Sequence, residues 1–262
     1  MALHIGSNKI GSIYLGSTKI VEAYLGSTKI FGSAAPGPGP SIPAKTVRFR
    51  FEDDYDPTSS SEASLWVSGS TWTRVSSSPN VWDYYRDATD WTREFNNKFN
   101  RDNESNGVHV VEANLTGVEN LNSAFAQQSG TNLAAWLGMI KTVSKFYAPD
   151  ATNMRKCFNG IPYLQSIEVT SSASATNMAN MFEQDIRLTA FPTDMQTDLV
   201  SQFQTFGAGC RMVTNALAMY QKVSGQATLP TYYSNAFLNC GIDTAYASDL
   251  ALIPSSWGGT RA

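Results

Sequence analysis

Short segments of alternating apolar and polar residues occupy the start of the chain and are separated by polar turns. Three copies of one unit, each with a Gly-Ser-Asn/Thr-Lys stretch between β-prone residues, stand at 4–10, 14–20 and 24–30. Polar turns between alternating segments predict β-hairpins. Residues 20–25 alternate so that both faces of the expected strand carry apolar groups.

These hairpin repeats are too short to bury their apolar groups alone, because chains below about 40 residues usually need oligomerisation, metals or disulfides. We therefore expect them to pack around the symmetry axis of a homo-oligomer, and of the possible oligomers we expect a homotrimer. The hairpins could instead dock as added strands on another protein. A free meander against the main domain is the alternative. Lys9, Lys19 and Lys29 stand at the turns, and we expect them to keep strand ends soluble rather than to bind a charged ligand.

A change of composition follows the repeats. Residues 33–43 alternate Pro with Gly and offer almost no apolar side chain, which predicts a tether of partly polyproline character. We therefore expect four parts along the chain: a β-repeat anchor at 1–32, a Pro/Gly tether at 33–45, a β-rich cap segment at 46–107 and a repeat domain at 108–262.

Short β-like runs separated by Ser, Gly, Pro and Asn predict four strands in the cap segment: Val47–Phe51, Ser64–Val67, Thr71–Val75 and Val81–Tyr85. A helix is expected to begin near Asp90, which would cap it. The acidic residues of 52–56 lack the regularly alternating ligands and central Gly of an EF-hand loop, so they predict a solvated turn rather than a calcium site.

Four tryptophans allow two interpretations, a sugar-stacking platform or a core and cap on the repeats that follow: Trp66, Trp72, Trp82 and Trp91.

Loose repeats begin near Val108. Three equally spaced segments place an aliphatic residue six positions after an aromatic one: Phe158–Leu164, Phe182–Leu188 and Phe206–Met212. In the first two units a Met precedes the Phe by four positions, so that both would share one face of a short helix. The aliphatic residue six positions after the Phe would begin a short strand.

A short helix and a short strand in every unit of this size predict a solenoid, because only neighbouring units can cover each apolar face. The predicted fold class is α+β: N-terminal β-hairpin repeats, a small β-rich segment, and an irregular leucine-rich-repeat-like α/β solenoid. The C-terminal end of the chain predicts only a cap that ends near Trp257.

The Thr-Asn-Met-x-x-Met-Phe-x-x-x-x-x-Leu units resemble the BspA-like leucine-rich repeats of bacterial surface antigens and bacteriophage structural proteins. The Leu-Gly-Ser-Thr-Lys-Ile repeats, and the Val-Trp-Asp and Asp-Trp segments at 81–83 and 90–91, look like those of phage virion proteins. The repeat resemblance covers about 108–242 and departs in the third unit, where Gln202-Phe203 replaces Asn-Met. It implies a virion protein of the fibre, spike or decoration type.

Composition argues against several partners. Charged residues make up 16% of the 262 residues, the net charge is -3, and no Lys/Arg run exceeds two residues, so nothing supplies the positive field that nucleic-acid binding requires. The longest nearly apolar stretch, 133–140, is far below the roughly 20 residues of a membrane span. The N-terminus lacks the pattern of a secretion signal, so we expect synthesis in a host cytoplasm and release by lysis.

The residues offer little for catalysis or metal binding. His4 lies in the anchor and His109 in a predicted strand, so only His109 could belong to a catalytic pair in the repeat domain. Cys157, Cys210 and Cys240 are odd in number and follow no CxxC spacing, which predicts buried small hydrophobes rather than disulfides or a zinc site. We name no catalytic, cofactor-binding or metal-binding residue, and expect no cofactor.

Five acidic residues on adjacent repeats could face one groove, as a carboxylate pair for glycoside hydrolysis would: Glu168, Glu183, Asp185, Asp194 and Asp198. Solvated loop charges are the expected interpretation, and the protein is not expected to be an enzyme.

Taken with the resemblance to phage virion proteins, the sequence predicts a non-enzymatic phage virion protein that mounts by residues 1–32 and displays a solenoid for host-surface attachment. Polar residues such as Ser171–Ser174 make a host glycan or surface protein the expected partner, together with other virion proteins at the anchor. The alternatives are a purely structural virion scaffold, a host-polysaccharide depolymerase and a bacterial surface adhesin.

Overall fold

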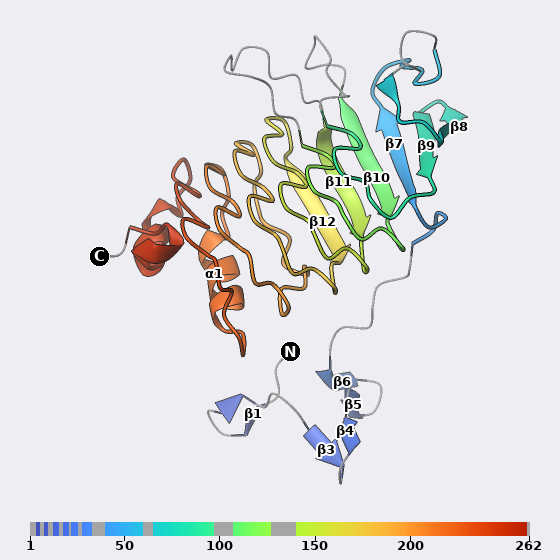
Figure 1. The fold of residues 1–262 in the computed structure, drawn as a ribbon. Helices are drawn as coiled ribbons and strands as arrows, with labels where there is room; N and C mark the ends of the chain where they lie inside the picture. The colour runs from blue at the N-terminus through green and yellow to red at the C-terminus, as the bar shows by residue number, and fades with distance from the viewer. Residues whose placement is uncertain are drawn as a thin grey trace. The chain divides into compact units, whose positions relative to one another are not determined.

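The computed structural model describes residues 40–59, 65–96, 107–126 and 140–260, together with the backbone of short strands within residues 1–32. The chain divides into two compact units, 1–39 and 40–262. Figure 1 shows the elements of both units.

The N-terminal unit contains three antiparallel hairpins, one for each sequence repeat. Their strands are β1 (His4–Ile5), β2 (Asn8–Lys9), β3 (Ile13–Leu15), β4 (Thr18–Ile20), β5 (Glu22–Leu25) and β6 (Thr28–Gly32). The hairpin prediction is confirmed. Each pair forms its own two-stranded sheet, and β4 and β5 belong to different hairpins, so the prediction of one strand over 20–25 is wrong.

The described part of the C-terminal unit is mainly β, with one six-stranded mixed open sheet and one short α-helix, α1 (Ala216–Ser224). The strands, in chain order, are β7 (Thr46–Phe51), β8 (Ser70–Ser77), β9 (Asn80–Arg86), β10 (Val108–Asn114), β11 (Ile140–Tyr147) and β12 (Ser166–Ser171). Their order in the sheet is β12-β11-β10-β7-β9-β8 (Figure 1). The pairs β10–β11 and β11–β12 are parallel, and the other neighbours are antiparallel.

The sheet spans the boundary expected between residues 107 and 108, because β10 pairs directly with β7. The described residues of 46–107 and those of the following repeats therefore share one sheet and one core. The predicted strands at Val47–Phe51, Thr71–Val75 and Val81–Tyr85 are confirmed, whereas Leu65–Val67 form no strand and Ser64 lies outside the described residues. Alternate β7 residues Val47, Phe49 and Phe51 are buried in that core.

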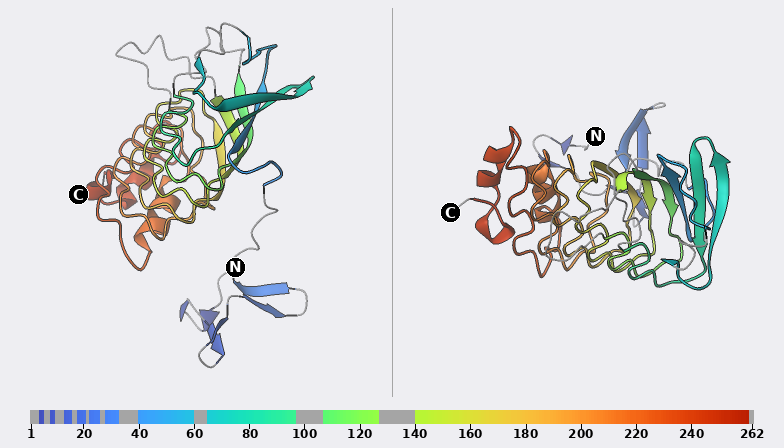
Figure 2. Two further views of the ribbon diagram at one scale, coloured as in Figure 1. Left: turned by 45° about the vertical axis from the view of Figure 1, so that its right-hand side comes forward. Right: turned by 90° about the horizontal axis from the view of Figure 1, so that it is seen from above.

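Beyond the strands, the chain forms successive turns that pair with one another (Figure 2). Isolated parallel bridges join one residue of each turn to the next, in the order Asp90, Asn120, Asn153, Asn177, Gln202 and Tyr232. Each of these six residues marks the start of one turn, and we call the six turns together the turn ladder. In the first four, the side-chain oxygen accepts a hydrogen bond from the N–H two positions on, as in Asn177 Oδ1 with Ala179 N at 3.1 Å. This is why Asn, whose short amide can bond its own backbone, recurs there.

The short helix expected in each repeat is not formed. In the turn after Asn153, the N–H groups of Met154 and Phe158 donate to carbonyls of the next turn, those of Asn177 and Met181, at 2.8 and 3.0 Å. These N–H groups are therefore unavailable for bonds within a helix. Lys156, whose φ is 55°, also lies in the left-handed region, which an α-helix does not contain. The helix expected from Asp90 is likewise replaced by the first such turn, in which Trp91 N donates to Asn120 O at 2.8 Å.

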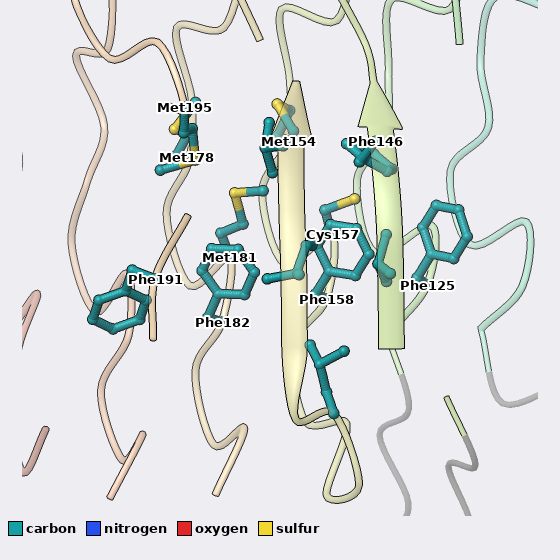
Figure 3. Packing of buried hydrophobic residues seen from close by; sticks show 14 of the residues in the cluster. Phe125, Phe146, Met154, Cys157, Phe158, Met178, Met181, Phe182, Phe191 and Met195 are labelled. Atoms are coloured by element: carbon teal, nitrogen blue, oxygen red, sulfur yellow. The ribbon is translucent and has the colours of Figure 1, made fainter. Parts of the chain in front are cut away.

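Phenylalanine rings from successive turns pack along the ladder. The rings of Phe125 and Phe158 have centroids 5.2 Å apart, and those of Phe158 and Phe182 lie 5.8 Å apart with planes 8° from parallel (Figure 3). Phe206 contacts Phe182 at 5.3 Å, but the two rings are nearly perpendicular. The three phenylalanines predicted to recur therefore lie in consecutive contact.

The equal spacing of the repeats holds for one interval only. The bridge from Asn177 to Gln202 spans one position more of the chain than the bridge from Asn153 to Asn177. Phe206 consequently stands one position earlier in its turn than Phe182, and Gly207 occupies the place that corresponds to Phe182. The ring of Phe191 fills the space above this glycine.

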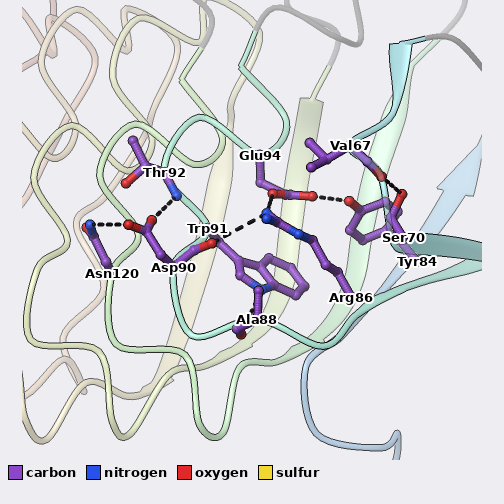
Figure 4. A network of polar contacts seen from close by, with 10 residues as sticks. All are labelled: Val67, Ser70, Tyr84, Arg86, Ala88, Asp90, Trp91, Thr92, Glu94 and Asn120. Carbon is purple, nitrogen blue, oxygen red and sulfur yellow. Dashed lines mark hydrogen bonds and ion pairs between the residues drawn. The ribbon is translucent and has the colours of Figure 1, made fainter.

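A buried carboxylate joins the first turn to the sheet. The Glu94 side chain accepts hydrogen bonds from Tyr84 Oη and Arg86 Nη1 (Figure 4). Burial, followed by the bond to Glu94, raises the pKa of Tyr84. At the other end Trp257 is buried and stacks on Phe237 and Tyr233, which confirms the cap expected there.

Among the described residues, no helix is both long and apolar enough to cross a bilayer.

Candidate functional site

A hollow of about 250 Å³ lies beside β12, the strand at one edge of the sheet. One wall comes from β12 residues 166–169 and the other from 189–194 of the following turn, with Asn215 completing it. Ser166, Glu168, Thr193 and Asp194 are exposed, whereas Ile167, Val169, Phe191 and Pro192 are buried. The most exposed side chains at this hollow are therefore polar.

The hollow exists because the two walls are joined only at their ends. At one end Thr189 N donates to Gln165 O at 3.1 Å. At the other, Ser172 N donates to Gln196 Oε1 at 2.6 Å, and Ser172 Oγ donates to Gln196 O at 3.1 Å. Between these two sets of hydrogen bonds lies Pro192, which has no N–H to donate to a neighbouring strand.

The helix α1 follows this turn where another strand would continue the sheet. The Asn215 side chain bonds both backbone groups of Phe191, accepting from its N–H at 2.8 Å and donating to its carbonyl at 2.9 Å. Lys222 Nζ donates to the carbonyls of Thr193 and Met195. Side chains thus satisfy the backbone groups that a further strand would have paired. Burial lowers the pKa of Lys222, and Asp194 and Asp198 act in the opposite direction.

Of the five acidic residues singled out from the sequence, only Glu168 and Asp194 line this hollow. Asp185 is fully buried, and its Oδ1 accepts the N–H of Ile161 at 2.7 Å. Burial raises the pKa of Asp185 well above the usual range. Glu183 accepts hydrogen bonds from the amides of Asn159 and Asn180, and Asp198 is exposed.

A second polar cluster, which the sequence did not predict, joins the end of β7 to β10 and β11. Glu52 Oε2 accepts from Lys141 Nζ at 2.6 Å and from Gly107 N at 2.8 Å, and Glu52 Oε1 lies 3.0 Å from His109 Nε2. His109 Nδ1 lies 2.7 Å from Thr142 Oγ1. Glu52 stands in a bend directly after β7, as the sequence predicts, but both of its carboxylate oxygens are engaged by other parts of the chain.

The electrostatics of this cluster favour a structural role. Burial alone would raise the pKa of Glu52, but the hydrogen bonds from Lys141, His109 and Gly107 outweigh it and lower the pKa to about 2. Burial lowers the pKa of His109, against the opposing effect of Glu52. The order Thr142, His109, Glu52 resembles that of a hydrolase triad, but these three residues do not line the hollow beside β12. The cluster fixes β7, β10 and β11 to one another.

All four tryptophans lie in the core or pack against it. Trp82 and Trp91 are buried in the core. Trp66 and Trp72 are half-buried, with rings 4.8 Å apart, and line a separate hollow of about 330 Å³ together with Ser68, Gly69 and neighbouring residues.

The remaining candidates are buried in the core or lie outside the described part. Cys157, Cys210 and Cys240 are free and buried, as predicted, and Cys210 and Cys240 donate to the carbonyls of Phe182 and Gly207. Among the described residues, no three His, Cys, Asp or Glu side chains are grouped as a metal site would require. The side chains of four further residues lie outside the described part: His4, Lys9, Lys19 and Lys29.

No protein-family model matches the chain, and neither a curated protein nor a solved structure is significantly similar to it.

Proposed function

We propose that this chain is a non-enzymatic attachment protein of a bacteriophage virion, of the fibre, spike or decoration type. In this proposal the turn ladder is a leucine-rich-repeat-like solenoid that displays a contact surface to the host cell. The N-terminal hairpins mount the protein on the particle and join copies into a homotrimer.

The hydrogen bonding of the ladder supports the solenoid. Each turn donates N–H groups to the next turn and joins it through one parallel bridge, so its apolar face is covered mainly by its neighbours, which is the physical property of solenoids. The resemblance of the Thr-Asn-Met units to BspA-like repeats supports the same interpretation.

One observation carries the display role: the edge strand β12 exposes its polar side chains. Ser166, Glu168 and Thr170 are exposed while Ile167 and Val169 are buried, and within the described part of the chain no further strand pairs with this edge. Exposed hydroxyl and carboxylate groups on a rigid strand are suited to hydrogen-bond a polar cell surface. Several copies on one particle would strengthen weak single contacts through avidity.

Binding of the fluorescently labelled full-length protein to a panel of bacterial strains tests the proposal. We expect saturable binding to some strains, competition by unlabelled protein, and loss of binding after periodate oxidation of the surface sugars. The absence of binding to every strain, with the protein found instead between other virion proteins in particle images, would show a scaffold role. Shortening of isolated surface polysaccharide would show a depolymerase.

A further inference from the structure

The C-terminal end of the predicted tether is bound to the sheet. Both the backbone N–H and the hydroxyl of Ser41 donate to the carboxylate of Glu112, and Ser41 N lies 2.5 Å from Glu112 Oε1. Asn114 Nδ2 donates to the carbonyl of Ile42 at 2.7 Å. Because Glu112 and Asn114 both belong to β10, these bonds hold residues 40–44, which we call the strap, against one strand.

The strap covers the face of the sheet that is turned away from the core. Val47 of β7 and Ala113 of β10 are buried in the core, and side chains alternate between the two faces of a strand. Their neighbours Thr46, Glu112 and Asn114 therefore point to the opposite face, where they are buried as well. The side chains beneath the strap are thus polar.

Removal of the strap would leave the core intact. Ile42 is buried, but it lies outside the hydrophobic core that the described residues form. The pairing of β7 with β9 and β10 uses no residue of the strap, and the polar side chains beneath it can bind water instead. Arg48 stands opposite Glu112 in the pairing of β7 with β10, so this carboxylate keeps a cationic neighbour. The strap can therefore leave the sheet while the C-terminal unit stays folded.

The chain is held more firmly directly after the strap. Lys45 O accepts a hydrogen bond from Arg86 N at 3.3 Å, and Lys45 Nζ pairs with Asp87 at 2.6 Å. The next six residues, Thr46–Phe51, form β7, which pairs with a strand on each side. A load that enters through residues 1–39 reaches the bonds of Ser41 first and β7 last.

We propose that residues 40–44 are a releasable strap, which detaches from β10 under load as one unit while the C-terminal unit stays folded. Such local opening costs less than global unfolding where few apolar contacts are lost. Five extended residues span at most about 17 Å, so release lengthens the tether by up to this amount. The use of that length, extra reach between particle and host, rests on the proposed attachment function, whereas the release itself does not.

Thiol labelling of full-length Ile42→Cys tests the release, because a thiol at position 42 is accessible only when the strap opens. Cys157, Cys210 and Cys240 are buried in the core and report global unfolding in the same sample. We expect position 42 to react roughly tenfold faster than these three or more. Low concentrations of urea should hardly change its rate, since opening of the strap exposes little surface.

Substitutions at two serines show whether the bonds to Glu112 control the opening. Ser41→Ala removes the hydroxyl donor to that carboxylate and should speed labelling at position 42 roughly tenfold or more. The matched control Ser68→Ala, at an exposed position outside the strap, should leave the rate unchanged. Equal labelling rates at position 42 and in the core, or equal rates in the two serine variants, would overturn the proposal.

Optical-trap extension of the full-length protein, held at its two ends, tests the response to load without a substitution in the strap. We expect a step of at most about 17 Å before the sheet unfolds, and Ser41→Ala should shift that step to lower force. A single unfolding event with no earlier step would overturn the strap. Failure of the protein to bind any cell, together with this early step, contradicts attachment and leaves the strap standing.

Discussion

Gly207 lies directly beneath the ring of Phe191, so closely that a Cβ atom at position 207 would overlap the ring. Phe191 is itself buried and contacts the rings of Phe182, Phe206 and Phe237 at 5.9, 5.1 and 6.2 Å, which leaves it little room to move. The turn that begins at Gln202 thus has glycine where the two earlier turns have Phe, and the ring of Phe191, from the preceding turn, fills the space.

Gly207→Ala should therefore destabilise the protein by about 1–3 kcal/mol, the usual cost of an overpacked core. Denaturant unfolding of the full-length protein measures this change. The control is Phe191→Leu, which removes the end of the ring, combined with Gly207→Ala. We expect the double variant to lose less stability than the sum of the two single changes, and additive losses would contradict direct contact.

This relationship also explains what the sequence could and could not predict. The positions of Phe158 and Phe182 follow from a repeated pattern, and their contact was foreseeable. The shift at Phe206 was not, because equal spacing aligns Phe206 with Phe182 by residue type, whereas the true register, one position longer, aligns Gly207. The bridge from Asn177 to Gln202 shows that register, which the sequence indicates only where Gln202-Phe203 replaces Asn-Met.

The acidic residues at the hollow beside β12 and the polar cluster around Glu52 also differ in how far the sequence could predict them. Glu168 and Asp194 stand close to one repeat apart, so the repeat itself predicted that they could share a groove. Glu52 contacts His109 and Lys141 across 57 and 89 residues of sequence, and no local pattern predicts such a contact. The short helices were predicted wrongly because spacing alone does not show whether N–H groups bond within a turn or to the next one.

The ladder asparagines give a second prediction. Asn177 Oδ1 accepts the N–H of Ala179, a buried residue, at 3.1 Å. Asn177→Ala leaves that N–H without its partner and should cost about 1–3 kcal/mol, measured by denaturant unfolding. Asn177→Asp retains the acceptor oxygen and should recover most of the loss. Equal destabilisation by Ala and Asp would show that the hydrogen bond is unimportant.

Asp185 predicts how stability changes with pH. Burial raises its pKa in the folded protein well above the usual value, whereas the unfolded chain has a pKa of about 3.9. Its contribution to stability is therefore complete below about pH 3.9 and declines as pH rises toward the folded pKa. Asp185→Asn keeps an oxygen that can accept the N–H of Ile161 but does not ionise.

The stability of Asp185→Asn relative to the unmodified protein should thus increase as pH rises above about 3.9. Thermal unfolding of both proteins between mildly acidic and neutral pH measures the difference. Melting temperatures that stay a constant distance apart over this range would contradict the raised pKa of the buried carboxyl.

Glu52 predicts the opposite dependence. Its pKa of about 2 in the folded protein lies below the unfolded value of about 4.3, so its stabilising contribution is present above about pH 4.3 and is lost as pH falls toward the folded pKa. Glu52→Gln should be less stable than the unmodified protein at neutral pH and should lose less stability over that acid range, as thermal unfolding would measure. Glu119→Gln, at an exposed position, is the matched control and should keep the stability of the unmodified protein at neutral pH.

The N-terminal hairpins carry the last prediction. Each hairpin forms a two-stranded sheet of its own, and isolated two-stranded hairpins are at best marginally stable in water. Neighbouring copies can supply the missing partners, which is why we assign assembly to residues 1–32. Residues 40–262 form a separate compact unit with its own core, so a chain starting at residue 40 should fold and remain monomeric. Light scattering should give the full-length protein three times the mass of one chain, and equal subunit numbers with and without residues 1–39 would remove the hairpins as the element of assembly.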